Sequence, residues 1–212
     1  MSQLNDLLTK ADQTQQSLLS SSKEERFAIY QQQILSNEQG DSALVWERIL
    51  SLAKTEELVI TEELLQQLYA FFAKAPTSYR SIERIDQKSG YHSPSPEDLP
   101  HIMHHLADQY FSSKTTLHPI ELSAMMYKRI LDIQPFMEEE INEQIALLIL
   151  NVILLHYGYA PVLLFHTQKE LTEKTLMESR IHYDMEPFCI LIANELLQSM
   201  EQTIKQLSNS VH

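Results

Sequence analysis

Three consecutive carboxylates, Glu138, Glu139 and Glu140, follow a proline-phenylalanine pair in the second half of the chain. Pro135 cannot continue a preceding helix, so a new helix is expected to begin just after the pair. Carboxylates in the first turn of a helix are stabilised by the helix dipole, by about 0.3–1 kcal/mol each. We therefore interpret the triplet as an acidic helix cap. The alternative is a divalent-metal patch in which Glu138, Glu139 and Asp132 supply the oxygen ligands that hard cations prefer.

A second group of residues that could do chemistry is His101, His104 and His105. Their spacing of i, i+3 and i+4 places all three on one face of a helix, where imidazoles could bind a metal ion. The sequence lacks the glutamate of an H-E-x-x-H motif, and no fourth ligand stands nearby. The favoured interpretation is that they are polar side chains on a helix surface.

The element that must position the acidic triplet is the long helix after the break, within residues 117–164. Residues 145–155 are apolar at every position except Asn151. Such a helix is expected to be buried nearly all round, and it is too short to span a bilayer. Gly158 stands where a helix usually stops.

The other elements are predicted to be mainly helices. Ser22 with Glu25 three residues later makes a capping box, and Ser95 followed by Pro96 marks another helix start. Helices are predicted at 23–35, 43–54, 61–75, after residue 95, and at 119–132, 169–182 and 187–207. Residues 1–22 are expected to form a short amphipathic helix or a loosely held tail. Residues 79–92 around Gly90 are the only region expected to form strands, as a short hairpin.

The composition limits the classes of partner. The 212 residues include 16 basic and 29 acidic side chains, for a formal charge of −13, and there is no run of lysine and arginine. Such a chain repels polyanions, so neither nucleic acid nor an acidic membrane surface is expected as a partner. The single cysteine, Cys189, fits a reducing compartment, and residues 1–20 have no signal-peptide core. A cytoplasmic location is therefore expected.

Four segments, in order, resemble the core of the Fic (Fido) domain family: TSYRSIERIDQKSGYHSPSPEDLPHIMHHL, HPIELSAMMYKRILDIQPF, NVILLHYGYAPVLL and YDMEPFCILIANELL. The resemblance extends over about residues 76–206. It implies an all-α, mainly helical Fic-like fold with a short β-hairpin flap. The expected organisation is an N-terminal helical layer, 1–75, and a Fic-like core, 76–212, in one compact unit. Tyr79 and Arg80 match the Tyr-Arg pair of the family and are expected to anchor the start of the flap.

The family carries the motif HPFx[D/E]GNGRxxR at the break, where this chain has QPFMEEEINEQI. Pro135 and Phe136 match the motif, and Glu138 stands at the acidic position that holds Mg²⁺ in the family. The family histidine takes a proton from a target hydroxyl as the hydroxyl attacks a nucleotide. Gln134 stands in its place, and an amide has no titratable nitrogen near neutral pH, so general-base action is expected to be lost.

The phosphate-binding half of the motif also differs. Glu139, Glu140 and Ile141 replace the Gly-Asn-Gly whose backbone N–H groups face the diphosphate, and Asn142 and Ile145 replace the two arginines. Two like charges about 4 Å apart repel by about 4 kcal/mol at an effective dielectric of about 20. With its arginines gone, the site is expected to have no cations to offset this repulsion. Nucleotide binding in the family's mode is therefore expected to be lost.

The expected function is a catalytically inactive protein-binding or regulatory protein without a cofactor. Its partner would be another protein, met through flap residues Ile82, Glu83, Arg84 and Ile85, because family flaps register a target segment by main-chain pairing. An ordinary exposed hairpin is the alternative for that segment. The rival function is a protein nucleotidyltransferase (AMPylation-type) or related phosphate-group transferase that uses ATP, with Mg²⁺ on Glu138, in an altered site. A third reading is a purely structural or oligomer-forming protein.

Overall fold

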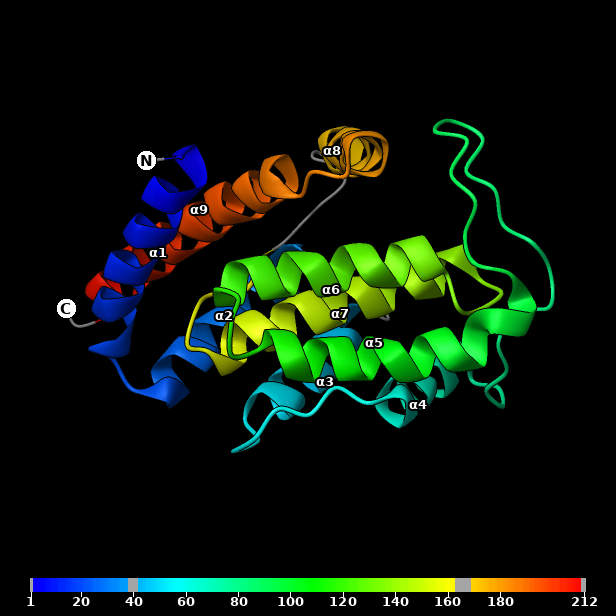
Figure 1. Cartoon of the computed structure of the whole chain (residues 1–212). Helices are drawn as coiled ribbons and strands as arrows, with labels where there is room; N and C mark the ends of the chain where they lie inside the picture. The colour runs from blue at the N-terminus through cyan, green and yellow to red at the C-terminus, as the bar shows by residue number, and fades with distance from the viewer. Residues whose placement is uncertain (1, 38–41, 163–168, 211–212) are drawn as a thin grey trace.

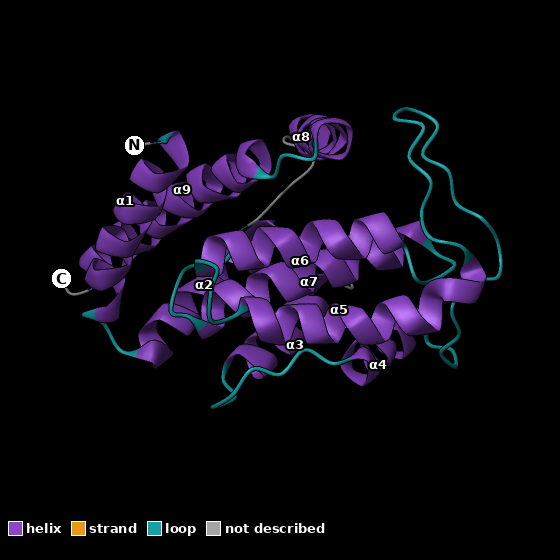
Figure 2. Cartoon of the chain, viewed as in Figure 1, coloured by secondary structure: helices purple, strands orange, loops and turns teal. Residues whose placement is uncertain are grey.

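The computed structural model describes residues 2–37, 42–162 and 169–210 as helices joined by loops (Figures 1 and 2). The helices are α1 (Gln3–Leu19), α2 (Lys23–Asn37), α3 (Ser42–Ala53), α4 (Glu62–Ala73), the 3₁₀ turn η1 (Pro96–Asp98), α5 (Leu99–Ser113), α6 (Pro119–Ile133), α7 (Glu139–His156), α8 (Lys169–His182) and α9 (Glu186–Ser210). The predicted mainly helical fold is confirmed.

Helix α7 is the centre of the fold. It packs against α6, α3 and α4 (Figure 1), and its side chains from Ile145 to Leu155 are buried except for the half-buried Leu147. The expected burial of this helix is therefore confirmed. Asn151, its one polar residue there, accepts a hydrogen bond from the Val162 N–H at 2.7 Å and donates to the Val162 and Leu147 carbonyls at 3.0 and 3.1 Å. These bonds satisfy the buried amide and hold the chain beyond Gly158 against the helix.

Local capping fixes both ends of α6 and so the position of the break. The His118 Nδ1 accepts from the Ile120 N–H at 3.2 Å, and the Glu121 carboxylate accepts from the His118 N–H at 3.1 Å. Pro119 occupies the first helical position, where its missing N–H costs nothing. At the other end Gln134 has a left-handed backbone with φ of 44°, and Pro135 prevents continuation.

The N-terminal segment, for which helix and tail were both open, is the helix α1. It buries Leu4, Ala11 and Leu18 at a spacing of seven residues and packs along α9 (Figure 1). Helices α3 and α4, from the same part of the sequence, pack against α7. The boundary at residue 75 stays a prediction, because residues on both sides of it contribute to the same hydrophobic core.

The β-hairpin predicted for residues 79–92 is not seen. In the described residues this segment is a loop that projects from one end of the helices (Figure 1), with one isolated antiparallel bridge between Ile85 and His92. One reason is that the buried Arg80 side chain binds the Ile82 carbonyl, which would accept from the Ser95 N–H if the ladder continued.

Two sequence features can be compared with the structure directly. None of the helices in the described ranges has the length and apolar character to cross a bilayer. Cys189 is a free, buried thiol on α9, and burial raises its pKa to about 12. Such a thiol is a packing residue rather than a nucleophile.

Candidate functional site

The candidate site is the break between α6 and α7, where the motif-like residues lie. Phe136 is fully buried and stacks on Tyr69, with ring centroids 4.4 Å apart, and more distantly on Tyr79 at 5.9 Å. The Arg80 N–H donates to the Pro135 carbonyl at 2.9 Å. Aromatic packing and a backbone hydrogen bond therefore fix the break from the side of α4 and the loop.

Arg80 connects the start of the loop to the end of α6. Its guanidinium donates to the carbonyls of Gln134 at 2.8 Å, Ile82 at 2.7 Å, Ile133 at 3.2 Å and Pro94. The side chain is 1% exposed, and burial lowers the pKa of its guanidinium. These contacts agree with the anchoring role expected for this residue.

Asn142 fills the position of the first motif arginine with a structural amide. Its Oδ1 accepts from the Phe136 N–H at 3.1 Å, and its Nδ2 donates to the carbonyls of Phe136 at 2.9 Å and Glu138 at 3.0 Å. Ile145, at the position of the second arginine, is fully buried in the core. Both positions are therefore used to hold the break and the helix together.

The acidic triplet has a cationic partner that the sequence analysis missed. Arg84, from the loop, forms an ion pair with Glu139 and also donates to the Met137 carbonyl. Glu138 and Glu140 are exposed. The expectation of a site without cations was wrong, because a side chain 55 positions away in the sequence reaches the start of α7.

A cavity of about 580 Å³ lies between the loop, the ends of α6 and α7, and α8. Gln134, Glu139 and Asn142 are among the residues that line it. The ionisable residues in its lining are the basic Arg84, Lys88, Lys174 and Arg180 and the acidic Asp86, Glu139, Glu143, Glu170 and Glu173. The cavity is thus of mixed charge, with one more acid than base.

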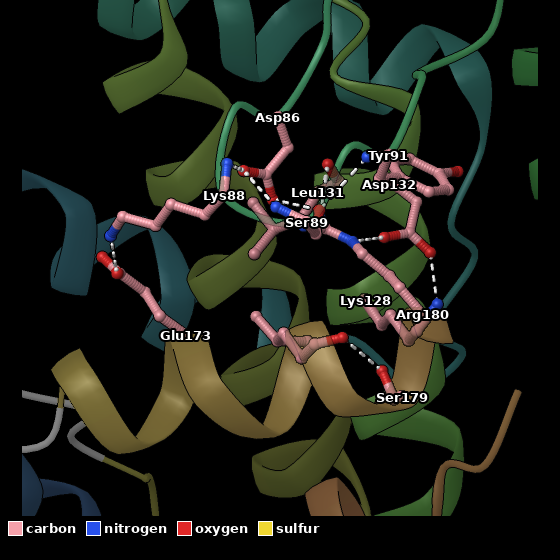
Figure 3. A network of polar contacts seen from close by, with 11 residues as sticks. Asp86, Lys88, Ser89, Tyr91, Lys128, Leu131, Asp132, Glu173, Ser179 and Arg180 are labelled. Atoms are coloured by element: carbon pink, nitrogen blue, oxygen red, sulfur yellow. Dashed lines mark hydrogen bonds and ion pairs between the residues drawn. The ribbon is translucent and has the colours of Figure 1, made fainter. Parts of the chain in front are cut away.

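Two of the cations at this cavity, Lys88 and Arg180, are held by acids of the same chain (Figure 3). The Arg180 guanidinium donates to Asp132 at 2.8 Å and to Asp86 at 2.9 Å, and it lies over the Tyr91 ring at 4.9 Å. Lys128 forms a second ion pair with Asp132, which is 3% exposed. This network ties the loop to α6 and α8, and it was not foreseen from the sequence.

The alternative of a carboxylate metal patch is not supported by this geometry. Asp132 is buried between Lys128 and Arg180, whereas Glu138 is exposed at the start of α7. In 2–37, 42–162 and 169–210, no three histidine, cysteine or acidic residues come together in a way that could hold a metal ion.

The other sequence-predicted positions lie apart from the cavity or at its rim. His101, His104 and His105 are exposed on α5, as the favoured interpretation had it. Ile82 and Ile85 are both 47% exposed on the loop, and Ile85 with Arg84 also lines the cavity. Glu83 is exposed and borders a different, shallow depression beside Arg80.

Stability below neutral pH should depend on Asp86. Burial opposes its ionisation, but hydrogen bonds from the Ser89 hydroxyl and from the N–H groups of Lys88 and Ser89, with the charge of Arg180, outweigh burial and lower its pKa. A lowered pKa in the folded state adds stability that is present above the unfolded pKa, near 4, and is lost as pH falls through the folded value. The urea unfolding free energy of Asp86→Asn should therefore fall less between neutral and acid pH than that of the wild type.

The control for this measurement is Asp98→Asn. Asp98 is exposed at the start of α5, and its side chain makes no capping hydrogen bond. Its substitution should change the acid dependence less than Asp86→Asn does. Equal acid dependence in the Asp86→Asn variant and the wild type would contradict the role given to the loop carboxylate.

Comparison with known proteins gives one sequence relative and several structural ones. No family model matches the chain. It is 31% identical over 116 residues, 54% of this chain, to "Protein adenylyltransferase Fic" of Nematostella vectensis, and the match spans 26% of that protein's length. The fold is similar to that of a Fic-domain-containing signaling protein from Bacteroides thetaiotaomicron, with a TM-score of 0.75, 20% identity, and coverage of 94% of this chain and 96% of the other.

A second solved structure, Fic-1 from C. elegans, has a TM-score of 0.71 and 16% identity. The alignment covers 95% of this chain and 71% of the Fic-1 chain. The two structures share the fold of this chain, and the alignment with the sequence relative extends over 54% of this chain. Taken together, the solved structures show that the chain has the fold of Fic-domain proteins, and the partial sequence match to the relative agrees with it.

Proposed function

We propose that this chain is a Fic-family protein that does not transfer nucleotides and acts by binding another protein. The observation that carries the proposal is the ion pair between Arg84 and Glu139 at the start of α7. This helix N-terminus is where the family resemblance places the diphosphate of a nucleotide. Here a carboxylate and a guanidinium of the chain itself meet at that place.

The chemistry of the neighbouring residues supports the same proposal. Gln134 offers an amide where a general base is needed, and an amide cannot accept the proton of a target hydroxyl near neutral pH. The side chain at Asn142 is committed to three hydrogen bonds with the break. Ile145 is buried in the core, so neither position can offer a charge to a phosphate.

The residues present do not fit Mg²⁺ and a nucleotide in the manner of the family. Glu138 is a single exposed carboxylate, and the described residues around it bring no second and third ligand together. The next two positions carry further carboxylates, Glu139 and Glu140, rather than glycine backbone. Arg84 already neutralises Glu139, but the exposed Glu140 would still repel a phosphate that approached it.

The second candidate is a nucleotidyltransferase or related phosphate-group transferase with an altered site. The observation in its favour is the basic group at the cavity, made of Arg84, Lys88, Lys174 and Arg180. The curated relative is named an adenylyltransferase, although the match covers about a quarter of its length. This candidate requires Arg84 to leave Glu139 and face a phosphate instead.

Nucleotides should not stabilise the wild-type protein. Its melting temperature is expected to change by less than about 1 °C with Mg²⁺-ATP or Mg²⁺-CTP in millimolar excess. A ligand at about 100 times its Kd would add about 2.7 kcal/mol, which corresponds to several degrees for a domain of this size. Thermal unfolding followed by calorimetry measures the difference, and a shift of several degrees would favour the transferase.

Two variants separate the role of the ion pair from that of charge alone. Glu139→Ala removes one carboxylate and releases Arg84, whereas Glu140→Ala removes one carboxylate from the same turn and leaves the ion pair intact. If the pair closes the site, Mg²⁺-ATP should stabilise the first variant more than the second. Equal behaviour of the two variants would remove the ion pair as the cause.

The exposed apolar residues at the rim support protein binding. Ile82, Ile85 and Met137 are large apolar side chains that are 37–47% exposed on the loop and the break. The bridge at Ile85 also leaves much of the loop backbone without a strand partner, which a bound segment could supply.

Binding through this rim should be lost when a charge is placed on it. A native pull-down with the wild-type chain should capture the partner from cell extract. Ile85→Asp should abolish that capture, because it puts a charge in an apolar contact. Ile181→Asp is the matched control, since Ile181 is also exposed, at 53%, but lies on α8. Capture of the same protein by all three chains would rule out this rim as the contact.

A further inference from the structure

The first half of α5 carries a pair of imidazoles that point at one another. His101 and His105, one turn apart, are both exposed, and their Nε2 atoms are 3.0 Å apart. Their rings are nearly perpendicular, at 88°, with centroids 4.2 Å apart. No residue of α5 lines the cavity at the α6–α7 break, so this pair is separate from the candidate site above.

We propose that His101 and His105 form a binding site for a divalent transition-metal ion that favours ligands at right angles, such as Cu²⁺ or Ni²⁺. Imidazole nitrogen is a good ligand for these ions, and neighbours at i and i+4 on a helix face lie at the spacing for chelation. The two nitrogens lie close enough to share one ion once the rings turn so that both lone pairs face it.

The spacing of the nitrogens indicates the geometry of the ion. With metal–nitrogen distances of about 2.0–2.1 Å, two nitrogens 3.0 Å apart subtend roughly 94° at the metal. That angle matches adjacent positions of a square-planar or octahedral site. A tetrahedral ion would require the nitrogens to separate to about 3.3–3.4 Å.

Metal binding requires the proton between the two rings to move to another nitrogen. In the metal-free pair one Nε2–H donates to the other Nε2, so one lone pair is occupied. Metal binding moves that proton to Nδ1 of the same ring, which frees both Nε2 lone pairs without releasing a proton. The Nδ1 of His105 lies 3.8 Å from the Asp108 carboxylate, which favours a proton at that nitrogen and orients the ring.

Water supplies the remaining ligands. Within the described ranges the two histidines are not joined by a third residue that could complete the site. The site is therefore open to solvent, and the ion is expected to bind reversibly. The net charge of −13 and the nearby Asp108 favour a cation at this surface.

Titration calorimetry of the full chain with CuCl₂ and with NiCl₂, at about pH 7.5 where imidazoles are free to ligate, tests the proposal. The wild type should bind one ion at this pair, and His101→Ala and His105→Ala should each weaken it by at least about tenfold. His104→Ala is the matched control, because His104 is exposed on the same helix but its ring lies 6.2 Å from that of His105. Electron paramagnetic resonance of the Cu²⁺ form should show two nitrogen ligands in the wild type and one in either variant.

The variants are exposed and should keep the fold, which circular dichroism checks. The proposal is overturned if a variant with both His101→Ala and His105→Ala binds the ion as tightly as the wild type, or if the wild type binds no ion. A loss of equal size in His104→Ala would also overturn it, since that would point to a diffuse acidic surface. None of these outcomes depends on whether nucleotides bind at the α6–α7 break.

Discussion

Replacing Arg80 by alanine should lower the free energy of unfolding by about 3 kcal/mol, the largest loss expected of any single side chain in the loop. The buried guanidinium donates to four carbonyls, those of Gln134, Ile133, Ile82 and Pro94. Its removal leaves these acceptors without their partner and releases the loop from the end of α6. Urea unfolding at neutral pH gives the difference, and the melting temperature should fall by about 6–12 °C.

Arg129→Ala is the control for this prediction. Arg129 is half-buried and its guanidinium makes one hydrogen bond, to the side chain of Gln109 at 3.1 Å. The loss should then stay near 1 kcal/mol. If the two alanine variants lost similar stability, the carbonyl contacts of Arg80 would not be what holds the loop.

Replacing Asn142 by alanine should cost about 3 kcal/mol as well, for a related reason. The amide bridges the two sides of the break through Phe136 and the Glu138 carbonyl, and it is 1% exposed. Without it, a buried N–H and two carbonyls lose their partners, at about 1–3 kcal/mol for each group that stays unsatisfied. Thermal or urea unfolding measures this loss directly.

Asn194→Ala removes a comparable amide from an exposed position on α9, where the side chain donates to the Ile190 carbonyl at 2.9 Å. A change within about 0.5 kcal/mol is expected there. A small effect at both positions would show that the Asn142 bonds are replaced by water.

The contacts of Asn142 also predict that restoring the family arginine through Asn142→Arg will destabilise the break, because a longer cation has no room there.

The sequence was sufficient for most of the fold because the determining features are local. Residues 145–155 are apolar on all sides, Pro135 prevents continuation of α6, and Pro119 with Glu121 marks a helix start. Each of these acts within one or two turns of helix. The hairpin was predicted wrongly from β-branched residues around Gly90, because the effect of Arg80 on the Ile82 carbonyl depends on the tertiary fold.

The candidate site was only half predictable for the same reason. The types of residue at Gln134, Asn142 and Ile145 were evident from the sequence, but their contacts were not. Arg84 meets Glu139 across 55 positions, and Arg180 meets Asp86 across 94. No local pattern marks such pairs, and their charges alone suggested a uniformly acidic site.

The packing of α1 along α9 has a consequence for how the chain is made. During synthesis α1 leaves the ribosome well before α9, the helix that covers Leu4, Ala11 and Leu18. A nascent chain must therefore carry this apolar stripe uncovered while the residues between the two helices are made. The stripe is a place where a chaperone can bind during that interval, and α1 reaches its final packing only once α9 has emerged.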